Sequence, residues 1–217
     1  MTDAAQAQRK RVFRLLTVAG LALTSASFFI PMWWVSLKAP NYPEHTFPQG
    51  VKILMHWNGV RNGCTLEVRE EVEEEEPLDC VHEMNTINHY IGMHPIERGA
   101  RLEFALSPYL FVVSAVMLVA ALFYGGPFWW VLFLPGVLLP VGFVADFVGW
   151  LWWFGHNLHE WAAFTVKPFM PTALGEGKVA QFSTYAYPDY GFALCLAGSA
   201  ALLLALLVRR KQLQEGA

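Results

Sequence analysis

The side chains best suited to metal chemistry gather in two segments of this chain, residues 38–103 and 155–189. All seven histidines lie in these segments, and several methionines lie among them. Imidazole binds copper in either oxidation state, and the soft thioether sulfur of methionine favours Cu(I), whereas hard ions prefer oxygen ligands. The mixture therefore indicates copper. The alternative for any one methionine is that its flexible side chain fills an apolar gap.

The densest cluster surrounds the end of a short helix, which we expect over residues 83–91 with Gly92 as its terminator. His89 and Met93 would then lie one turn apart on one helix face, with His94 close beside them. This His-x3-Met-His spacing favours a soft metal ion, although it is far less specific than paired C-x-x-C motifs. The alternative is an interfacial turn whose polar groups are capped by hydrogen bonds.

A second cluster, His156 and His159, follows the third long apolar run of the sequence. The i,i+3 spacing places both imidazoles on one face if the helix continues, and the first segment would supply the remaining ligands. Glu160 would orient an imidazole by accepting a hydrogen bond from it. The alternative is a pair of membrane-surface histidines bonded to headgroups or water. Additional candidate ligands in the two segments are His56, His82, Met84 and Met170.

Two cysteines, Cys64 and Cys80, bracket an acidic run at residues 70–76. In an oxidising compartment we expect a disulfide between them, which closes this stretch as a hairpin. The alternative is a pair of thiolate copper ligands. The acidic run is typical of a solvated hairpin tip, although it would also attract a basic partner or a cation.

The elements that must carry these clusters are membrane helices. Only 15% of the 217 residues are charged, and the charges leave long uncharged runs between them. A bilayer core of about 30 Å needs about 20 apolar residues in helical form. We therefore expect four transmembrane helices, over residues 14–37, 104–124, 128–154 and 190–208.

The expected fold class is a membrane all-α protein, with four transmembrane helices and a small extracytoplasmic β-containing region. The β element is a hairpin with strands over residues 51–57 and 65–72, which follow a β-type pattern around a turn at Asn58 and Gly59. The chain then divides into five parts, residues 1–37, 38–103, 104–154, 155–189 and 190–217.

Basic residues at both ends of the chain orient the expected helices. Lysine and arginine cluster just before the first helix and just after the last one, and such clusters mark the cytoplasmic side. We therefore expect a multi-pass protein of the bacterial inner membrane with both termini in the cytoplasm and both histidine-bearing segments outside. Tryptophans at the expected helix ends, such as Trp33, Trp34 and Trp150, are typical of interfacial anchors.

One ionisable residue, Asp146, lies inside the otherwise uncharged third helix. A carboxyl group at membrane depth is costly and is usually paired or functional. We expect it to bind a proton, to bond to a neighbouring helix or to support the metal region near the helix end. Its short distance from the interface weakens the inference, because a side chain near a helix end can reach the headgroup region.

Three stretches of the sequence resemble a little-characterised family of bacterial membrane proteins: Asn-His-Tyr-Ile-Gly-Met-His-Pro at 88–95, Pro-Phe-Met-Pro at 168–171, and Gly-Glu-Gly-Lys-Val-Ala-Gln-Phe at 175–182. That family is associated with gene clusters for copper-dependent respiration and denitrification, including the maturation of nitrous oxide reductase. The resemblance covers nearly the whole chain after the first helix. The acidic run at 70–76 is longer here than in the family pattern, which argues against a catalytic role for it.

These observations together predict a copper-handling or maturation protein that serves an extracytoplasmic copper enzyme, with copper as its cofactor. It would be an accessory protein rather than an enzyme, since the sequence has no nucleotide-binding loop, Ser-His-Asp pattern or carboxylate dyad. Haem is not expected, because no C-x-x-C-H motif is present and no histidine lies within an expected transmembrane helix.

The same residues leave two alternatives open. In the first alternative, the chain is a non-catalytic subunit of a membrane respiratory oxidoreductase. Its outer segments would dock a copper or haem electron carrier, and the acidic run would steer that carrier. Alternatively, it would be a copper-dependent membrane oxidase or monooxygenase, with the histidine cluster as its active site. The expected partners are membrane lipid and either an extracytoplasmic copper enzyme or respiratory complex subunits. Nucleic acid is not expected, given the net charge of −3.

Overall fold

A computed structural model describes residues 3–64, 78–163, 165–179 and 181–215 of the chain. The chain forms two compact units, and each is described by itself. The helical unit comprises Met1–Ile30, Ala105–Val144 and Tyr190–Ala217. The sheet unit comprises Pro31–Phe104 and Ala145–Asp189.

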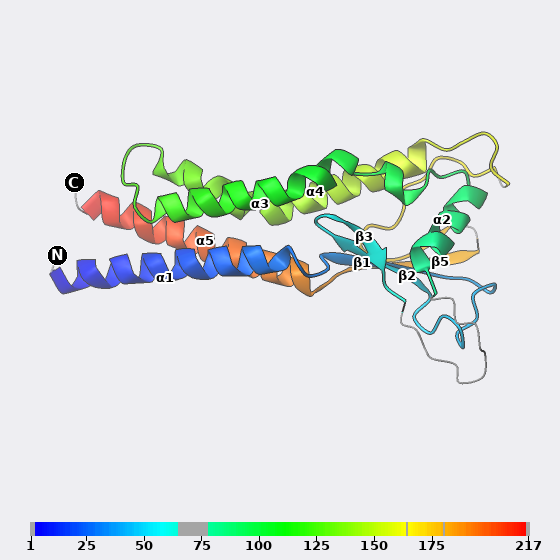
Figure 1. Cartoon of the computed structure of the whole chain (residues 1–217), viewed down its shortest axis with the longest axis horizontal. Helices are drawn as coiled ribbons and strands as arrows, with labels where there is room; N and C mark the ends of the chain where they lie inside the picture. The colour runs from blue at the N-terminus through cyan, green and yellow to red at the C-terminus, as the bar shows by residue number, and fades with distance from the viewer. Residues whose placement is uncertain (1–2, 65–77, 164, 180, 216–217) are drawn as a thin grey trace. The chain divides into compact units, whose positions relative to one another are not determined.

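Two long helices form the framework of the helical unit, α1 (Asp3–Ser27) and α5 (Tyr190–Glu215), which run antiparallel side by side (Figure 1). Glycines allow this close approach. A Cβ atom added at Gly198 would lie 2.7 Å from Thr24 Cγ2 and 3.1 Å from the carbonyl oxygen of Gly20. Small residues at a helix interface let the two backbones pack closely, as is common between membrane helices.

The remaining helices of this unit supply the rest of its core. Buried side chains from four elements form its main core: Phe13 on α1, Leu118 on α3, Phe133 on η2 and Leu202 on α5 are each at most 3% exposed, and Val137 of α4 packs against them. Helix α3 comprises Arg101–Ala121, the 3-10 helix η2 comprises Trp129–Phe133, and α4 comprises Leu134–His156. Both α3 and α4 continue into the sheet unit, α3 at its N-terminal end and α4 at its C-terminal end.

Three helices in the described part of the chain are long and apolar enough to cross a membrane: Arg101–Ala121, Trp129–His156 and Tyr190–Gln214. This indicates a membrane protein. The expectation of four transmembrane helices is wrong, because the expected first helix, residues 14–37, is helical only as far as Ser27 and is not among these three. The expectation that both termini face the cytoplasm came from the basic residues at the two ends of the chain and agreed with four crossings; three crossings do not support it.

The reason lies in the residues that follow α1. The uncharged part of α1 runs only from Leu15 to Ser27, which is shorter than the roughly 20 residues that a crossing needs. Pro31 follows, and a proline lacks the backbone N–H that a continuing helix requires and disfavours helical geometry in the residue before it. The aromatic stretch that was expected to end the helix is instead the strand β1 (Trp33–Lys38).

Among the described residues, the sheet unit has five antiparallel strands in the order β3-β2-β1-β5-β4. The all-α fold class is therefore wrong, because this sheet is a substantial part of the protein. The central strand β1 pairs with β2 on one side and with β5, from the far end of the unit, on the other (Figure 1). The strands besides β1 are β2 (Val51–His56), β3 (Gly59–Asn62), β4 (Gly175–Val179) and β5 (Phe182–Pro188).

The expected hairpin is present in part. β2 matches the first expected strand, and the partner strand β3 follows directly after the turn rather than at residues 65–72. That second expected strand and the acidic run at 70–76 lie outside the described residues. Cys64 and Cys80 form a disulfide with their Cα atoms 6.0 Å apart.

The disulfide connects the end of the hairpin to the short helix α2 (Cys80–Tyr90). Asp79 caps this helix, because its side chain accepts hydrogen bonds from the backbone N–H groups of Val81 and His82. The helix packs on β2 and β3 (Figure 1). Its buried residues Met84 and Ile87 join Val51 and Ile53 in the main hydrophobic core of the sheet unit.

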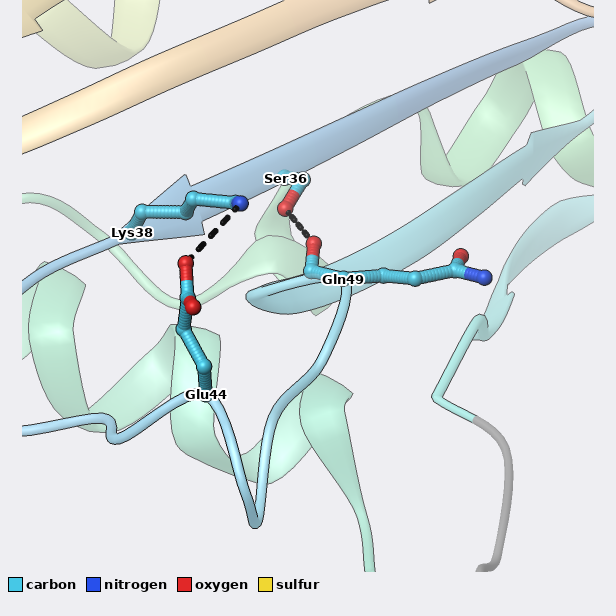
Figure 2. Close-up of polar contacts among 4 residues, drawn as sticks. All are labelled: Ser36, Lys38, Glu44 and Gln49. Carbon is cyan, nitrogen blue, oxygen red and sulfur yellow. Dashed lines mark hydrogen bonds and ion pairs between the residues drawn. The ribbon is translucent and has the colours of Figure 1, made fainter.

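The segment between β1 and β2 is held against the end of β1, as Figure 2 shows. The Ser36 hydroxyl donates a hydrogen bond to the carbonyl oxygen of Gln49, and Lys38 Nζ lies 3.8 Å from a carboxylate oxygen of Glu44. The Lys38 and Glu44 side chains are exposed to solvent, so we expect their ion pair to add little stability. The buried serine contact is the one that sets the path of the chain into β2.

Candidate functional site

The site begins at the end of α2, where the chain turns sharply. Gly92 adopts φ +80°, a left-handed conformation that glycine accepts at low cost. The N–H of Met93 donates to the carbonyl oxygen of Asn88 at 2.8 Å, which closes the turn. The turn buries His94, which is 8% exposed.

The second segment meets this turn through its backbone. α4 ends at His156, and the N–H of His159 donates to the carbonyl oxygen of Gly92 at 2.8 Å. A Cβ atom at Gly92 would lie 2.9 Å from the carbonyl oxygen of His159 and 2.9 Å from Ala162 Cβ. Gly92 is therefore required twice, for its own conformation and for the close approach of the two segments.

This contact brings two histidines together from the two histidine-bearing segments. His94 Nδ1 lies 2.8 Å from His159 Nε2, and the ring centroids are 4.0 Å apart. At that distance one nitrogen carries a proton and the other accepts it, so the two imidazoles form a hydrogen-bonded pair. We call His94 and His159 the histidine pair.

Arg98 determines which nitrogen accepts. Its Nη1 lies 3.0 Å from His94 Nδ1, and a guanidinium group can only donate hydrogen bonds. His94 Nδ1 therefore carries a lone pair, and His159 Nε2 is the donor of the histidine pair. Burial, then the neighbouring His159 and Arg98, lower the pKa of His94 below its ordinary value. Near neutral pH His94 is an uncharged imidazole, which is the form that binds metals.

Tryptophan rings cover the histidine pair from both sides. Trp153 stacks on His94 with centroids 5.0 Å apart, and Trp161 stacks on His159 at 4.7 Å. Trp161 also contacts His89, and the centroids of these two rings are 4.5 Å apart. The result is a series of stacked aromatic rings that holds the two imidazoles in place.

The first predicted cluster does not share one face. His89 is exposed, whereas Met93 is buried at 9% exposure. The expectation that they lie together fails because the helix ends before Met93, so helical spacing does not apply to it. The side chain of Met93 instead lines an apolar cavity of the sheet unit. His94, which was expected only to lie beside them, is the member that meets the second segment.

The second predicted cluster also separates. His156 is exposed, its Nδ1 lies 2.8 Å from the carbonyl oxygen of Trp152, and its ring stacks on Trp152 at 4.6 Å. His159 lies beyond the end of α4, so the i,i+3 relation of a continuing helix does not hold. Of these two, His159 is the one that contacts the first segment.

The additional candidate ligands have surroundings of their own. His56 is buried on β2 and is 5% exposed. Its burial lowers the pKa of its imidazole, and the charge of Arg61 lowers it further, whereas Asp189 acts in the opposite direction. Met84 belongs to the core beneath α2. His82 and Met170 are exposed to solvent.

The two carboxylates that were expected to support a metal have other surroundings. Asp146 has Trp150 and Glu103 as its neighbours, and Trp150 Nε1 lies 3.4 Å from a Glu103 carboxylate oxygen. Glu160 is exposed to solvent. The polar partner of His94, besides His159, is Arg98, which the sequence analysis did not single out.

Sequence reasoning missed three residues of this site: Arg98, Trp153 and Trp161. Trp153 was interpreted as an interfacial anchor, which is the commoner role near membrane helix ends, and Trp161 was given no role. Arg98 lies four residues after His94, a spacing that a helical turn would bring together, and this was the available signal. The 3-10 helix η1 (Ile96–Arg98) supplies that turn.

Within the described ranges, no group of three or more histidine, cysteine, aspartate or glutamate side chains is close enough together to hold a metal ion. The histidine pair would therefore bind a metal with two nitrogens, and further donors would come from outside these residue types. No family model, no curated protein and no solved structure matches the chain. The resemblance noted in the sequence thus stays a prediction.

Proposed function

We propose that this protein is a membrane-bound copper-handling protein, which binds copper at His94 and His159 and passes it to an extracytoplasmic copper enzyme. One observation carries the proposal: two histidines from segments far apart in the sequence have ring nitrogens 2.8 Å apart. A metal ion would need a lone pair on each of the two facing nitrogens. His94 Nδ1 already carries one, and His159 Nε2 would present the other once its proton has moved to His159 Nδ1 by tautomerisation. The ion would then take the place of that proton between the two rings and displace Arg98 from His94 Nδ1.

The geometry of the pair is compatible with a bound metal after a small movement. With metal–nitrogen bonds of about 2 Å, two imidazoles stand about 3.3 Å apart in a tetrahedral site and about 4 Å apart in a linear one. The observed spacing of 2.8 Å is that of a hydrogen bond. Rotation of the two side chains opens it by about 0.5–1.2 Å, given the same bond lengths.

The surroundings favour a soft, singly charged ion. Imidazole suits copper as well as zinc, and Trp153 and Trp161 stack on the two imidazoles rather than supplying hard oxygen ligands. The guanidinium of Arg98 lies near His94 and repels a divalent ion more than a monovalent one. Neutral His94 needs no deprotonation near pH 7. These points favour Cu(I) over Zn²⁺.

The location that we propose is the extracytoplasmic side of a bacterial inner membrane. Three helices are suited to crossing a membrane, and the sheet unit carries the Cys64–Cys80 disulfide. Disulfides persist in oxidising compartments and are rare in the cytosol. The sheet unit, with the histidine pair, would therefore face the periplasm, where copper enzymes of respiration receive their metal.

The experiment that tests the proposal is Cu(I) retention by detergent-purified protein, loaded in the presence of ascorbate rather than a thiol so that the disulfide survives. We expect near-stoichiometric copper in the wild type and loss of copper in His94→Ala and in His159→Ala. The matched control is His45→Ala, which removes an exposed histidine and should retain the metal. Loss of copper from the wild type itself would refute the metal site.

Two further variants test whether other predicted ligands contribute to copper binding. Met93→Leu keeps the volume of the side chain and removes its sulfur, and we expect it to retain copper because Met93 lines the apolar cavity. His156→Ala should also retain copper, since its ring contacts Trp152. Parallel loading with Zn²⁺ tests the choice of metal: a site that holds zinc and releases copper contradicts copper handling.

A further inference from the structure

A second candidate site is an apolar cavity of about 130 Å³ inside the sheet unit. Its walls come from the sheet through Val35 and Ile53, from α2 through Ile87, and from the last turns of α4 through Leu151 and Phe154. Phe169 belongs to the segment that follows α4 and contributes another wall. The cavity is separate in chemistry from the histidine pair, because its lining contains no histidine, cysteine or charged side chain.

The walls offer almost nothing to a polar ligand. Asn88, Thr172 and Thr184 are the polar residues of the lining. The two threonine hydroxyls are 2.7 Å apart and hydrogen-bond to each other, so most of their capacity is already used. A charged or strongly polar molecule would lose its hydration without replacement partners. The occupant must therefore be a hydrocarbon.

The size of the cavity makes a vacant state unfavourable. Protein interiors are packed so tightly that voids larger than a water molecule are few. An engineered apolar void of about 150 Å³ stays free of water and takes up benzene or xenon. The cavity here is nearly as large, and its apolar walls give water few partners. An apolar ligand would restore the lost dispersion contacts.

Two features of the walls indicate that the ligand of the cavity is a flexible chain rather than a compact ring. Three methionines, Met55, Met84 and Met93, line the cavity, and their unbranched side chains adapt to a variable occupant. Leu151 and Phe154 belong to a helix that is suited to crossing a membrane, so lipid is available along the same helix. We propose that the cavity binds the terminal segment of a fatty acyl chain, either of a membrane lipid or of a free fatty acid, because a void close in size to one that holds benzene admits only a few carbons of such a chain.

The test is photolabelling of the full-length protein in nanodiscs, followed by proteolysis and mass spectrometry. The probes are a fatty acid and a phosphatidylcholine, each with a diazirine near the end of the acyl chain. We expect labels on the peptides that carry Met84, Met93 and Phe169, and at least a fivefold loss when unlabelled oleate competes. This competition uses the wild type, so it does not depend on the folding of any variant.

A cavity-filling variant sharpens the result. Ile87→Phe places a larger side chain in the lining, and we expect its cavity labels to fall at least fivefold. The matched control, Leu203→Phe, makes a similar change at a half-exposed position of α5 and should leave the labels unchanged. Labelling by either probe supports the proposal and identifies the source of the chain. Labels confined to exposed residues of α3, α4 and α5, with none competed from the cavity, overturn it.

Discussion

The two units of this protein are stabilised by different kinds of contact. The helical unit consists of elements whose hydrogen bonds are local, and its tightest tertiary contact is between α1 and α5 at Gly20 and Gly198. The sheet unit depends on contacts between distant residues, including a central strand with partners from both ends of the unit and one disulfide. All seven histidines lie in the sheet unit. The helices that are suited to crossing a membrane thus lie largely in one unit, and the histidines lie in the other.

The disulfide gives the sharpest test of this difference. Cys64→Ser with Cys80→Ser removes a cross-link that closes a loop with a sequence separation of 16 residues, and loops of about 15 residues are associated with roughly 3 kcal/mol of stability. We expect the sheet unit to unfold at a lower temperature while most helical circular dichroism persists. Equal loss of both signals would mean that the two units unfold together.

The contact between Gly92 and His159 should be nearly as sensitive. Gly92→Ala imposes a strained φ of +80° and a clash with the His159 backbone, and backbone strain of this kind costs about 1–3 kcal/mol. We expect lower stability and weaker copper retention, because the clash separates the histidine pair. Thermal unfolding and metal content measure the two effects.

The control for this variant lies in the same unit. Gly175 has a similar φ of +88°, but a Cβ atom there would meet open space. Gly175→Ala should therefore carry the cost of backbone strain without the clash, and it should keep its copper. Equal copper loss in both variants would show that the close approach of Gly92 to His159 is unimportant for the site.

In the helical unit the corresponding test is at the α1–α5 contact. Gly198→Val places side-chain atoms against Thr24 and the backbone of Gly20, and overpacking of this kind costs typically about 1–3 kcal/mol. Gly142→Ala, on α4 where a Cβ meets open space, should instead stabilise by up to about 1 kcal/mol through helix propensity. Helical circular dichroism during heating measures both. Unchanged copper retention in both variants would show that packing in the helical unit does not affect metal binding in the sheet unit.

The smallest expected effect concerns His56 in the sheet unit. Burial and Arg61 lower its pKa below the ordinary value, against Asp189, so the unfolded chain binds a proton more readily than the folded one. The stability that this neutral imidazole contributes is present above the unfolded pKa of about 6.5 and is lost as the pH falls below it.

We therefore expect His56→Gln to reduce the decrease in melting temperature between about pH 7.5 and about pH 5.5, a range that spans the ordinary histidine pKa. The comparison uses the difference between the two pH values within each protein, so a uniform loss of stability in the variant does not affect it. An unchanged or larger decrease in the variant would contradict the assignment of His56 as a buried neutral histidine.

Local patterns in the sequence were enough to predict several elements. The runs that became α3, α4 and α5 are long, apolar and nearly free of charge, and hydropathy is a sum over neighbouring residues that needs no tertiary information. The short helix α2 and its termination at Gly92 also follow from adjacent residues. The gathering of histidines in two segments was likewise visible in the sequence.

Other features were settled only by the tertiary structure. Trp33–Lys38 is apolar enough to be a helix end, and only its pairing with β2 and β5 makes it the central strand. His94 meets His159 because two loops exchange a backbone hydrogen bond at Gly92, while Met93, one residue away, points into the cavity lining. Strand pairing and side-chain direction outside helices depend on contacts between distant residues, which spacing along the chain does not encode.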